Sequence, residues 1–561
     1  MEPRLWIEQI AFSDGSCVDL GGEDVVLIVG PNNAGKSATL RAVRDILTSN
    51  AKSPVVSQLK IGREGSADDV EQWLDTFAKR NDPYIPNPVF QALGTGVHKN
   101  QIPHYWQRST QLEGLARFFC HLLTADERLG ASNPPSSIAM IREPPSHPVH
   151  YLVRDDRLEA RLSAQFRKSF GVDLIVNRSA GNQVPLHVGT RPVPAAGEDR
   201  VSYQYVKQLE EIPQLHTQGD GMRSFAGVLL YTLAGRESIV LIDEPEAFLH
   251  PPQARQLGRL LVADKSERRQ LFVATHSGDV LRGVLDAYNA NVRVVRVRRA
   301  ADTNHIRQLD NRKVAELWND PLLRYSNILD GLFHEKVVVC EGDADARFYS
   351  AVADALFERK ELGDRRPDVM FTHCGGKDRC PMVIRSLREV DVPVAVAVDL
   401  DALNAEQPLR AIVEASGGAW ATVERDWRIV KAAVDSKKPE LDAKDVKDEI
   451  AKIVGSVTTS AFPDTATDSI KTLLRRSSPW SLAKSVGTSF VPSGDPTQAL
   501  DRLLIALRGM GVHVVEVGEV EGFARSVGNH GPKWVNEALK KNLMQDIELE
   551  QARRFVARLL A

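Results

Sequence analysis

The chain contains Gly30-Pro31-Asn32-Asn33-Ala34-Gly35-Lys36-Ser37, and this segment decides the fold of its N-terminal half. The segment matches the pattern G-x-x-x-x-G-K-[ST], with an apolar strand at 25–29 before it and a helical pattern from about 37 to 47 after it. Its glycines let backbone N–H groups turn inward around phosphate oxygens. We expect Lys36 to reach the β- and γ-phosphates of a nucleotide and Ser37 to hold Mg²⁺.

Two further apolar strands are expected to complete this site. Residues 238–242 form a strand that ends in Asp243 and Glu244, and residues 270–274 form another that is followed by His276. Carboxylates at the carboxyl end of a parallel strand stand where such sheets bind ligands. Asp243 is expected to bind Mg²⁺ through water, and Glu244 to act as the general base on the attacking water. His276 is expected to contact the γ-phosphate or to hold Glu244.

Composition sets wide limits on the function. The chain has 561 residues, which indicates two to four domains, and its formal net charge is −3. It is therefore not a basic nucleic-acid binder as a whole, although a local basic groove or bound metal ions can still hold phosphates. The five cysteines form no CxxC pair, which favours a reducing compartment. We find no signal peptide and no apolar stretch long enough to span a bilayer, so we expect a cytoplasmic protein without a membrane partner.

The order of apolar and turn segments predicts an α/β protein with two domains. We expect an ATPase domain at 1–310 with an irregular, Pro-rich insertion at about 51–215, and a polar connector at 311–334. A second domain follows at 335–561, with a βαβαβ run and a helical insertion at about 420–507. Strands that alternate with helices in this way predict a parallel sheet with helices packed on it.

The second domain carries acidic residues at its strand ends. Glu341 follows the strand at 336–340, Asp399 and Asp401 follow the strand at 392–398, and Lys377 follows a Gly-Gly turn between them. Clustered carboxylates repel one another unless cations neutralise them, and their hard oxygens suit Mg²⁺ or Mn²⁺. Two such ions could stabilise the attacking water and the leaving 3′ oxygen of a phosphodiester. The alternative is that these acidic residues only cap the N-termini of helices.

The N-terminal motifs resemble the ABC ATPase superfamily, in the branch of recombination and repair ATPases. The residues that carry the resemblance are Asp243-Glu244-Pro245-Glu246 and Phe248-Leu249-His250-Pro251. In that superfamily a signature segment from a partner completes the ATP site, which implies at least a homodimer. The candidate here includes Gly219 and Gly221, and it departs from the usual Ser-Gly-Gly-Gln form.

The strand ends of the second domain resemble the Toprim (topoisomerase–primase) domain. An ATPase followed by a Toprim domain resembles the OLD (overcoming lysogenization defect) family of ATP-linked nucleases and is similar to the nuclease subunit of Gabija-type antiviral defence. The resemblance implies a set of metal ligands, namely Glu341, Asp345, Asp399 and Asp401, with Glu519 and Glu521 as a later acidic segment. It also implies a catalytic lysine, which is Lys377 or Lys533.

The leading hypothesis is an ATP-hydrolysing, Mg²⁺- or Mn²⁺-dependent DNA endonuclease in bacterial anti-phage defence, which works alone or with a helicase or another defence partner. The alternative is an ATPase sensor or scaffold whose Toprim domain is catalytically idle. A repair ATPase of the structural-maintenance type would need long heptad arms, which the Pro-rich stretch 51–215 lacks.

Overall fold

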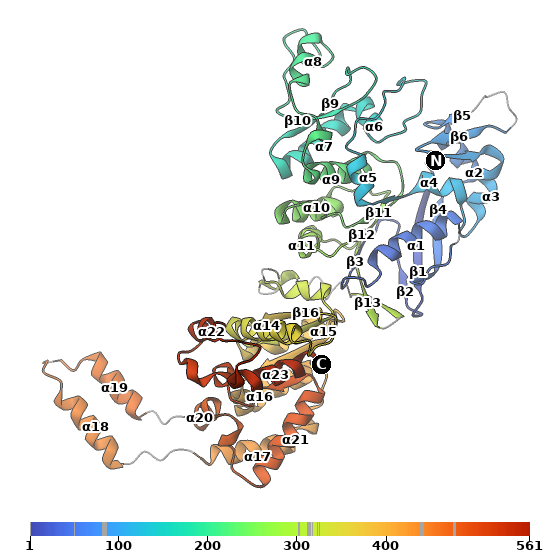
Figure 1. Ribbon diagram of the computed structural model, residues 1–561. Helices are drawn as coiled ribbons and strands as arrows, with labels where there is room; N and C mark the ends of the chain where they lie inside the picture. The colour runs from blue at the N-terminus through green and yellow to red at the C-terminus, as the bar shows by residue number, and fades with distance from the viewer. Residues whose placement is uncertain are drawn as a thin grey trace. The chain divides into compact units, whose positions relative to one another are not determined.

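The computed structural model divides the chain into two compact units, residues 1–333 and 334–561 (Figure 1). It describes most of the chain, namely residues 2–49, 51–80, 87–300, 303–310, 316, 318–321, 324, 326–437, 443–459, 461–474 and 478–561. Parts of the predicted insertion, connector and helical insertion therefore lie outside the described residues. The predicted connector at 311–334 falls almost entirely in the first unit, because that unit extends to Phe333.

The first unit is built on a six-stranded sheet in the order β14-β13-β3-β12-β11-β8. Its strands are β3 Val25–Val29, β8 Cys120–Leu123, β11 Ile239–Asp243, β12 Gln270–Ala274, β13 Val292–Ala300 and β14 Thr303–Gln308. All neighbouring pairs are parallel except β13 with β14. Every residue of β3 and β12 is buried, as expected for central parallel strands that are covered on both faces. This confirms the predicted α/β fold with a P-loop at the end of β3.

Helices follow these strands at their carboxyl ends. The P-loop leads directly into α1 (Lys36–Ser49), while α10 (Pro251–Ala263) and α11 (Gly278–Asp286) follow β11 and β12 and pack against each other. α9 (Asp220–Leu229) precedes β11 and packs against α5 (Ala125–Gly130) and α7 (Asp156–Phe170). The ligand side of the sheet is therefore the edge that holds the P-loop.

The predicted insertion at 51–215 includes two strands that belong to the ATPase domain itself. β4 (Val56–Glu64) pairs with β1 (Arg4–Phe12), which also pairs with β2 (Cys17–Asp19), so β4 belongs to an antiparallel sheet of the ATPase domain. β8 lies deeper in the predicted insertion, yet it is the edge strand of the central sheet beside β11. Both strands gain their partners only through tertiary pairing, which no local pattern signals.

The rest of 51–215 consists of small elements. The strands β5 (Lys79–Arg80), β6 (Val89–Ala92) and β7 (Thr95–His98) form one small sheet, and β9 (Asp173–Val176) pairs with β10 (Leu186–Gly189). Besides α5, the short α-helices of this stretch are α2 Ala67–Asp75, α3 Ile102–Gln107, α4 Ala116–Phe119, α6 Val149–Arg154 and α8 Tyr203–Glu210. The longest helix in its described part is α7, with 15 residues. The described part of this stretch therefore holds no coiled-coil arm.

The second unit is built on a fully parallel sheet in the order β16-β15-β17-β18. Its strands are β15 Lys336–Cys340, β16 Val369–His373, β17 Val394–Val398 and β18 Val512–Val514. α14 (Asp343–Glu358) connects β15 to β16, and α15 (Cys380–Glu389) connects β16 to β17. β16 thus lies on one side of β15 and β17 on the other. The direction in which strands are added reverses there, so a topological switch point lies between β15 and β17.

Helices cover both faces of this sheet. The face with Val338 and Ala395 packs on α14, on α22 (Pro532–Ala538) and on α23 (Glu550–Leu560). α15 packs on β15 and β17 and also contacts α16 (Glu406–Ala415). Right-handed crossovers in opposite directions place α14 and α15 on opposite faces. The sheet is therefore buried on both sides, which accounts for its apolar strands.

The predicted helical insertion contains five α-helices, α17 Glu424–Asp435, α18 Ala443–Gly455, α19 Asp464–Leu474, α20 Pro479–Val486 and α21 Asp495–Gly509, within its described residues. α18 packs on α19, and α20 contacts the short helix η7 (Leu400–Asn404) that follows β17. Among the described residues, no helix has the length and apolar character needed to cross a membrane.

Candidate functional site

The P-loop adopts a backbone that only glycine allows at its first position. Gly30 has φ +147, and a Cβ there would lie 2.0 Å from the carbonyl oxygen of Val297 on β13. Gly35 also has a positive φ, of +100. The ammonium of Lys36 is buried and donates to the carbonyl oxygens of Gly30 and Pro31, each at 2.8 Å. The loop therefore closes around its own lysine, over the space expected for phosphate groups.

Ser37 and Asp243 meet at this loop, although 206 positions separate them in the sequence. The hydroxyl of Ser37 donates to Oδ1 of Asp243 at 2.7 Å. Burial raises the pKa of Asp243, while the hydrogen bond from Ser37 lowers it. These are the two side chains that the sequence assigns to a magnesium ion, and a hydroxyl beside a carboxylate is a hard-oxygen donor pair that fits it.

The backbone turns sharply at Glu244, directly after β11. Glu244 has φ +48, which is a strained value for a side chain of this kind, and its N–H donates to the carbonyl oxygen of Ala274 at 2.8 Å. Nδ1 of His276 lies 3.3 Å from Oε1 of Glu244 and 3.3 Å from Oε1 of Glu246. The predicted base and the predicted histidine are therefore neighbours at one strand edge.

Glu246 links the ends of β11 and β12 through hydrogen bonds. Its Oε1 accepts from the hydroxyl of Thr275 at 2.7 Å and from the N–H of His276 at 2.9 Å. Burial raises the pKa of Glu246. The Glu246 side chain thus ties the segment after β11 to the segment after β12 and leaves Glu244 more exposed to act on a ligand.

The site also includes Arg128, which belongs to none of the sequence motifs. Its side chain is fully buried, and it donates to the carbonyl oxygens of Asp243 at 2.6 Å and Glu244 at 2.8 Å and to the hydroxyl of Ser224 on α9 at 3.0 Å. Arg128 therefore joins the acidic strand end to the helix that begins within the candidate signature segment. Since no motif contains it, it carried no signal in the sequence.

The two glycines of the candidate signature lie at the start of α9. Gly219 is the N-cap residue, and a Cβ at this position would meet nothing within 4 Å. A Cβ on Gly221 would lie 2.8 Å from the carbonyl oxygen of Phe248, so Gly221 allows a close approach of the segment after β11. An uncovered helix start of this kind leaves backbone N–H groups for a ligand or a partner, and its role in nucleotide binding stays a prediction.

A cluster of carboxylates lies at the switch point of the second sheet. Glu341 follows β15, while Asp399 and Asp401 follow β17, and each places one oxygen within 4.8 Å of the others. The N–H of Asp399 donates to Oε1 of Glu341 at 3.0 Å, which fixes the two strand ends to each other. The predicted grouping of these three side chains follows from the strand order, because adjacent parallel strands bring their carboxyl ends to one edge.

Two lysines enter this cluster. Nζ of Lys377 lies 3.0 Å from Oδ2 of Asp401, as its position after the Gly-Gly turn allows. Nζ of Lys484 lies 2.8 Å from Oδ2 of Asp399 and 3.7 Å from Oδ1 of Asp401. Lys533, the other predicted lysine, is exposed on α22. The structure thus brings Lys377 to the cluster together with Lys484, which no sequence motif indicated.

Lys484 reaches the cluster because α20 approaches the turn after β18 very closely. A Cβ on Gly518 would lie 1.9 Å from the carbonyl oxygen of Lys484, and a Cβ on Gly487 would lie 2.7 Å from that of Glu516. Both glycines have positive φ values, +109 and +89. The pair of glycines was the only sequence signal for this approach, and it was not specific enough to identify the lysine.

Asp345, Glu519 and Glu521 extend the acidic region. Asp345 accepts from the N–H of Gly342 at 2.9 Å, so it caps α14, and burial together with the charge of Asp399 raises its pKa to about 7. Glu519, Glu521 and His530 form a second group whose ligand atoms all lie within 4.8 Å of one another. Nζ of Lys484 is 3.9 Å from Glu519, so this lysine contacts both groups.

The first group fits a divalent cation by its donors and its charge. Oδ1 of Asp401 is buried and accepts no hydrogen bond from the described residues. Burial and the charge of Asp399 raise the pKa of Glu341 to about 7, and burial raises the pKa of Asp399 as well. A hard cation would supply the missing partner and remove the repulsion that favours the protonated carboxyls.

Comparisons with protein families agree with this division of the chain. Residues 332–401 match the family described as overcoming lysogenization defect protein-like, TOPRIM domain. Residues 10–53 match an AAA domain family, and residues 130–282 match another AAA domain family, whose description names an AbiEii toxin of a type IV TA system. The chain therefore joins an AAA ATPase domain to an OLD-like TOPRIM domain.

Individual relatives share only part of the chain. An OLD nuclease from Thermus scotoductus is 29% identical over 172 residues, which cover 29% of this chain and 30% of the relative. A solved SMC head bound to the C-winged helix domain of ScpA is 12% identical, with a TM-score of 0.34, and covers 55% of this chain and 99% of its own. An SMC head domain from Thermotoga maritima is 14% identical, with a TM-score of 0.29, and covers 55% and 100%. None of these findings supports the expected helicase partner.

Proposed function

We propose that this chain, which joins an AAA ATPase domain to an OLD-like TOPRIM domain, is an ATP-hydrolysing endonuclease that cuts DNA with Mg²⁺ or Mn²⁺. The observation that carries the proposal is the convergence of Glu341, Asp399 and Asp401 at one sheet edge, within 4.8 Å of one another. Carboxylates this close repel one another in the metal-free protein, and bound divalent cations would remove that repulsion.

The residues of the cluster would each do a separate part of the work. Glu341 and Asp399 are held together by a hydrogen bond, and Lys484 and Lys377 orient Asp399 and Asp401 through ion pairs. When bound, divalent ions supply positive charge for the attacking water and the leaving 3′ oxygen. The two lysines would add charge close to the phosphate that is attacked.

In the ATPase domain, Lys36 would bind the phosphates, and Ser37 with Asp243 would hold Mg²⁺. Glu244 would accept the proton of the attacking water at its carboxylate, with His276 beside it. A nucleotide site of the ABC type is completed by the signature segment of a second copy, so we propose that Gly219 and Gly221 of a partner copy act there in a homodimer.

Incubation with supercoiled plasmid tests the nuclease. We expect nicking or linearisation with Mg²⁺ or Mn²⁺, followed with and without ATP, and none with EDTA. Glu341→Ala should lose roughly a hundredfold or more of the rate, because the transition state loses a ligand of its charge-stabilising ions. Asp343→Ala is the matched control, since Asp343 lies two residues further along, at the start of α14, but is exposed and paired with Arg347. Equal cleavage by wild type and Glu341→Ala would refute the proposed site.

The proposal includes a role in bacterial anti-phage defence, supported by the similarity to a protein named OLD nuclease. Bacteria that express the wild-type chain should give fewer phage plaques than bacteria that express Glu341→Ala at the same level. Equal plaque counts over a broad phage panel would contradict this role.

One observation favours a second function, an ATPase sensor or scaffold with an idle TOPRIM domain. Lys377 and Lys484 already neutralise Asp401 and Asp399 from within the protein. A chain of this kind would bind no divalent cation at the cluster. Titration calorimetry of wild type and Glu341→Ala with Mn²⁺ separates the two functions, because only the nuclease predicts a heat of binding that the variant lacks.

A further inference from the structure

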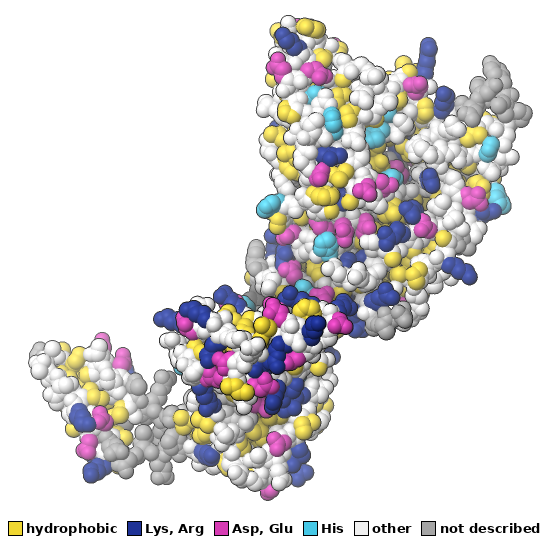
Figure 2. Space-filling view, viewed as in Figure 1, with side chains coloured by type: hydrophobic (Ala, Val, Ile, Leu, Met, Phe, Trp, Pro, Cys, Tyr) yellow, Lys and Arg dark blue, Asp and Glu magenta, His cyan; other side chains and the backbone are white. Residues whose placement is uncertain are grey.

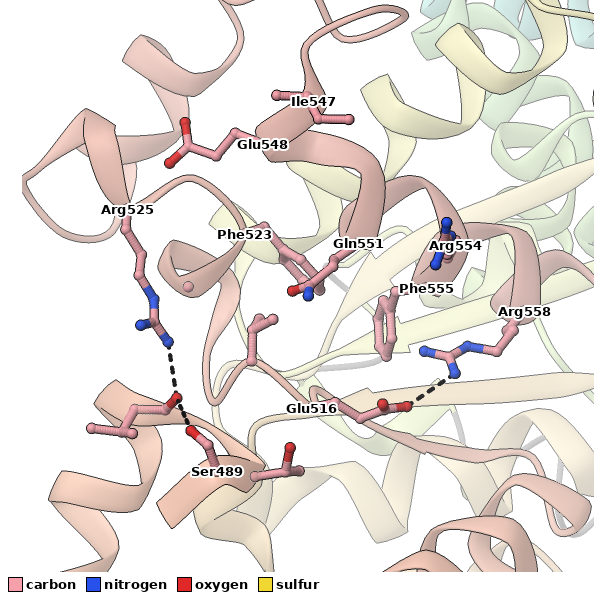
Figure 3. A pocket seen from close by; sticks show the side chains of 14 residues that line it. Ser489, Glu516, Phe523, Arg525, Ile547, Glu548, Gln551, Arg554, Phe555 and Arg558 are labelled. Carbon is pink, nitrogen blue, oxygen red and sulfur yellow. Dashed lines mark hydrogen bonds and ion pairs between the residues drawn. The ribbon is translucent and has the colours of Figure 1, made fainter.

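Two cavities adjoin α23 in the TOPRIM unit. The larger encloses about 700 Å³ and is lined by Glu516 and Val517, directly before the turn that carries Glu519, and by Val486 at the end of α20. Arg525 lies on one side of it, and Arg554 and Arg558 project from α23 on the other (Figure 3). This cavity therefore begins beside the acidic cluster without containing its carboxylates.

The second cavity lies next to the first, toward the amino ends of the strands. It encloses about 490 Å³ and is lined by Lys336 at the start of β15, Arg508 at the end of α21 and His513 on β18. Arg558 lines both cavities. The two cavities thus share a wall and follow α23 away from the cluster.

Positive charge exceeds negative charge along these walls. Five cationic side chains line the cavities, Lys336, Arg508, Arg525, Arg554 and Arg558, against two acidic side chains, Glu516 and Glu548. Glu516 is shared between Arg508 and Arg558, at 3.0 Å each. Figure 2 shows Lys and Arg side chains gathered among acidic ones over α14 and α23. In a chain of net charge −3, this excess is local.

Buried polar atoms on these walls have no partner within the described residues. His513 is only 8% exposed, and its Nδ1 is buried without a hydrogen bond, as is Nε of Arg558. Burial and the charges of Lys336, Arg558 and Arg508 lower the pKa of His513 to about 4, so its ring is neutral near pH 7. Buried polar atoms are normally paired, so these two nitrogens leave hydrogen-bonding capacity at the wall for a ligand.

We propose that the two cavities form one groove that binds the phosphodiester backbone of a nucleic acid strand beside the acidic cluster. Phosphate oxygens would accept from the unpartnered nitrogens of His513 and Arg558 and separate the mutually repelling cations. The groove is extended and its cations are spread over several elements, which suits a chain of phosphates better than one phosphate. The identity of the ligand as nucleic acid rests on the proposed nuclease function, whereas the phosphate chemistry does not.

The experiment measures binding in the absence of cleavage. The full-length chain in EDTA is titrated into a labelled single strand of about 20 nucleotides at several salt concentrations, with fluorescence anisotropy as the readout. The double variant K336Q/R554Q should bind at least roughly tenfold more weakly, and the slope of log K against log salt should fall by about 0.7 for each lost phosphate contact. Arg410→Gln, an exposed arginine on α16 paired with Glu414, should change neither quantity. Thermal melts of all variants establish that they fold.

A second readout separates nucleic acid from small phosphates. The ring resonance of His513, assigned with His513→Gln in histidine-labelled protein, should shift when the strand binds and should not shift with pyrophosphate at the same phosphate concentration. Unchanged affinity and salt slope in the folded K336Q/R554Q variant would overturn the groove, and an equal shift with pyrophosphate would overturn the nucleic acid assignment. A strand that binds here but is never cut with metal would refute the nuclease and leave the groove intact.

Discussion

At the ATP site, different side chains are expected to serve nucleotide binding and nucleotide hydrolysis. Lys36 is the cation enclosed by the P-loop, while Glu244 lies outside the loop and next to His276. Lys36→Ala should therefore abolish tight ATP binding, and Glu244→Gln should keep binding but stop hydrolysis, because an amide does not accept the proton of the attacking water. Fluorescent-nucleotide binding and phosphate release measure the two effects. Normal turnover by Glu244→Gln would remove Glu244 from the role of base.

The acidic cluster should bind metal in a pH-dependent way. The pKa values of Glu341 and Asp345 are raised to about 7 by burial and by Asp399, above the ordinary values of 4.5 and 3.8. Between about pH 4 and 7 the folded, metal-free chain thus binds more protons than the unfolded chain. The stability that these protons contribute is complete at low pH and is lost as the pH rises through about 7. Metal binding must displace these protons.

We therefore expect the affinity for Mn²⁺ to rise between about pH 6 and pH 8, with release of protons on binding. Titration calorimetry in two buffers of different ionisation enthalpy measures both quantities. Glu341→Ala should release fewer protons, and Asp343→Ala should behave as wild type. An affinity that is constant across this pH range would contradict the burial-driven shifts as the cause.

Packing between elements decides how the ATP site is held. Arg128 comes from α5, directly after β8, and donates to the end of β11 and to α9. Without its guanidinium, the carbonyls of Asp243 and Leu123 and the hydroxyl of Ser224 lose this donor, and the carbonyl of Glu244 keeps only the N–H of Ala247. Elements that are distant in the sequence would then be free to separate, although the P-loop itself would be untouched.

Arg128→Met should lower the free energy of unfolding by roughly 2–4 kcal/mol, because unpaired buried acceptors cost about 1–3 kcal/mol each and partly recover by relaxation. ATP hydrolysis should fall more than ATP binding, since the carbonyls of Asp243 and Glu244 are the groups released. Chemical denaturation and steady-state ATPase rates test this, with the exposed Arg117→Met on α4 as control. Wild-type stability of Arg128→Met would show that Arg128 is not a link between these elements.

At the scale of the whole molecule, ATP is expected to control assembly. One chain supplies one P-loop and one candidate signature segment, whose Gly219 flank is uncovered in the structure. We expect ATP to stabilise a two-fold dimer of the Glu244→Gln variant, because trapped nucleotide would bridge two copies. Light scattering at micromolar concentration measures this, with Lys36→Ala as the control that stays monomeric. A strict monomer under these conditions would argue against a shared site.

The two units also predict separate effects of the two sets of mutations. Each unit has its own sheet and its own buried core. The ATPase residues and the acidic cluster belong to different units, 1–333 and 334–561. A substitution in one site should therefore leave the folding of the other unit unchanged, and any effect of ATP on cleavage would have to pass between the units.

Local patterns in the sequence were enough to place the core strands and the residues directly after them. Val25–Val29, Gln270–Ala274 and Lys336–Cys340 form strands with the predicted bounds, because a continuous apolar run between turn residues is a local signal. Residues at the ends of parallel strands meet at one sheet edge, so the strand pattern placed Ser37 and Asp243 at one edge and Glu341 and Asp399 at another, while the strand order brought each pair into contact.

The other side chains that join these edges are selected by tertiary packing. Arg128 reaches Asp243 across 115 positions, β8 joins a sheet whose other strands lie far away in sequence, and Lys484 arrives from a helical insertion through close contacts at Gly518. The physical reason is that a hydrogen bond or ion pair depends on distance in space, while a sequence pattern reports only the few residues on either side. Charges that neutralise a buried carboxylate can come from any element that packs there, and packing is a property of the whole fold.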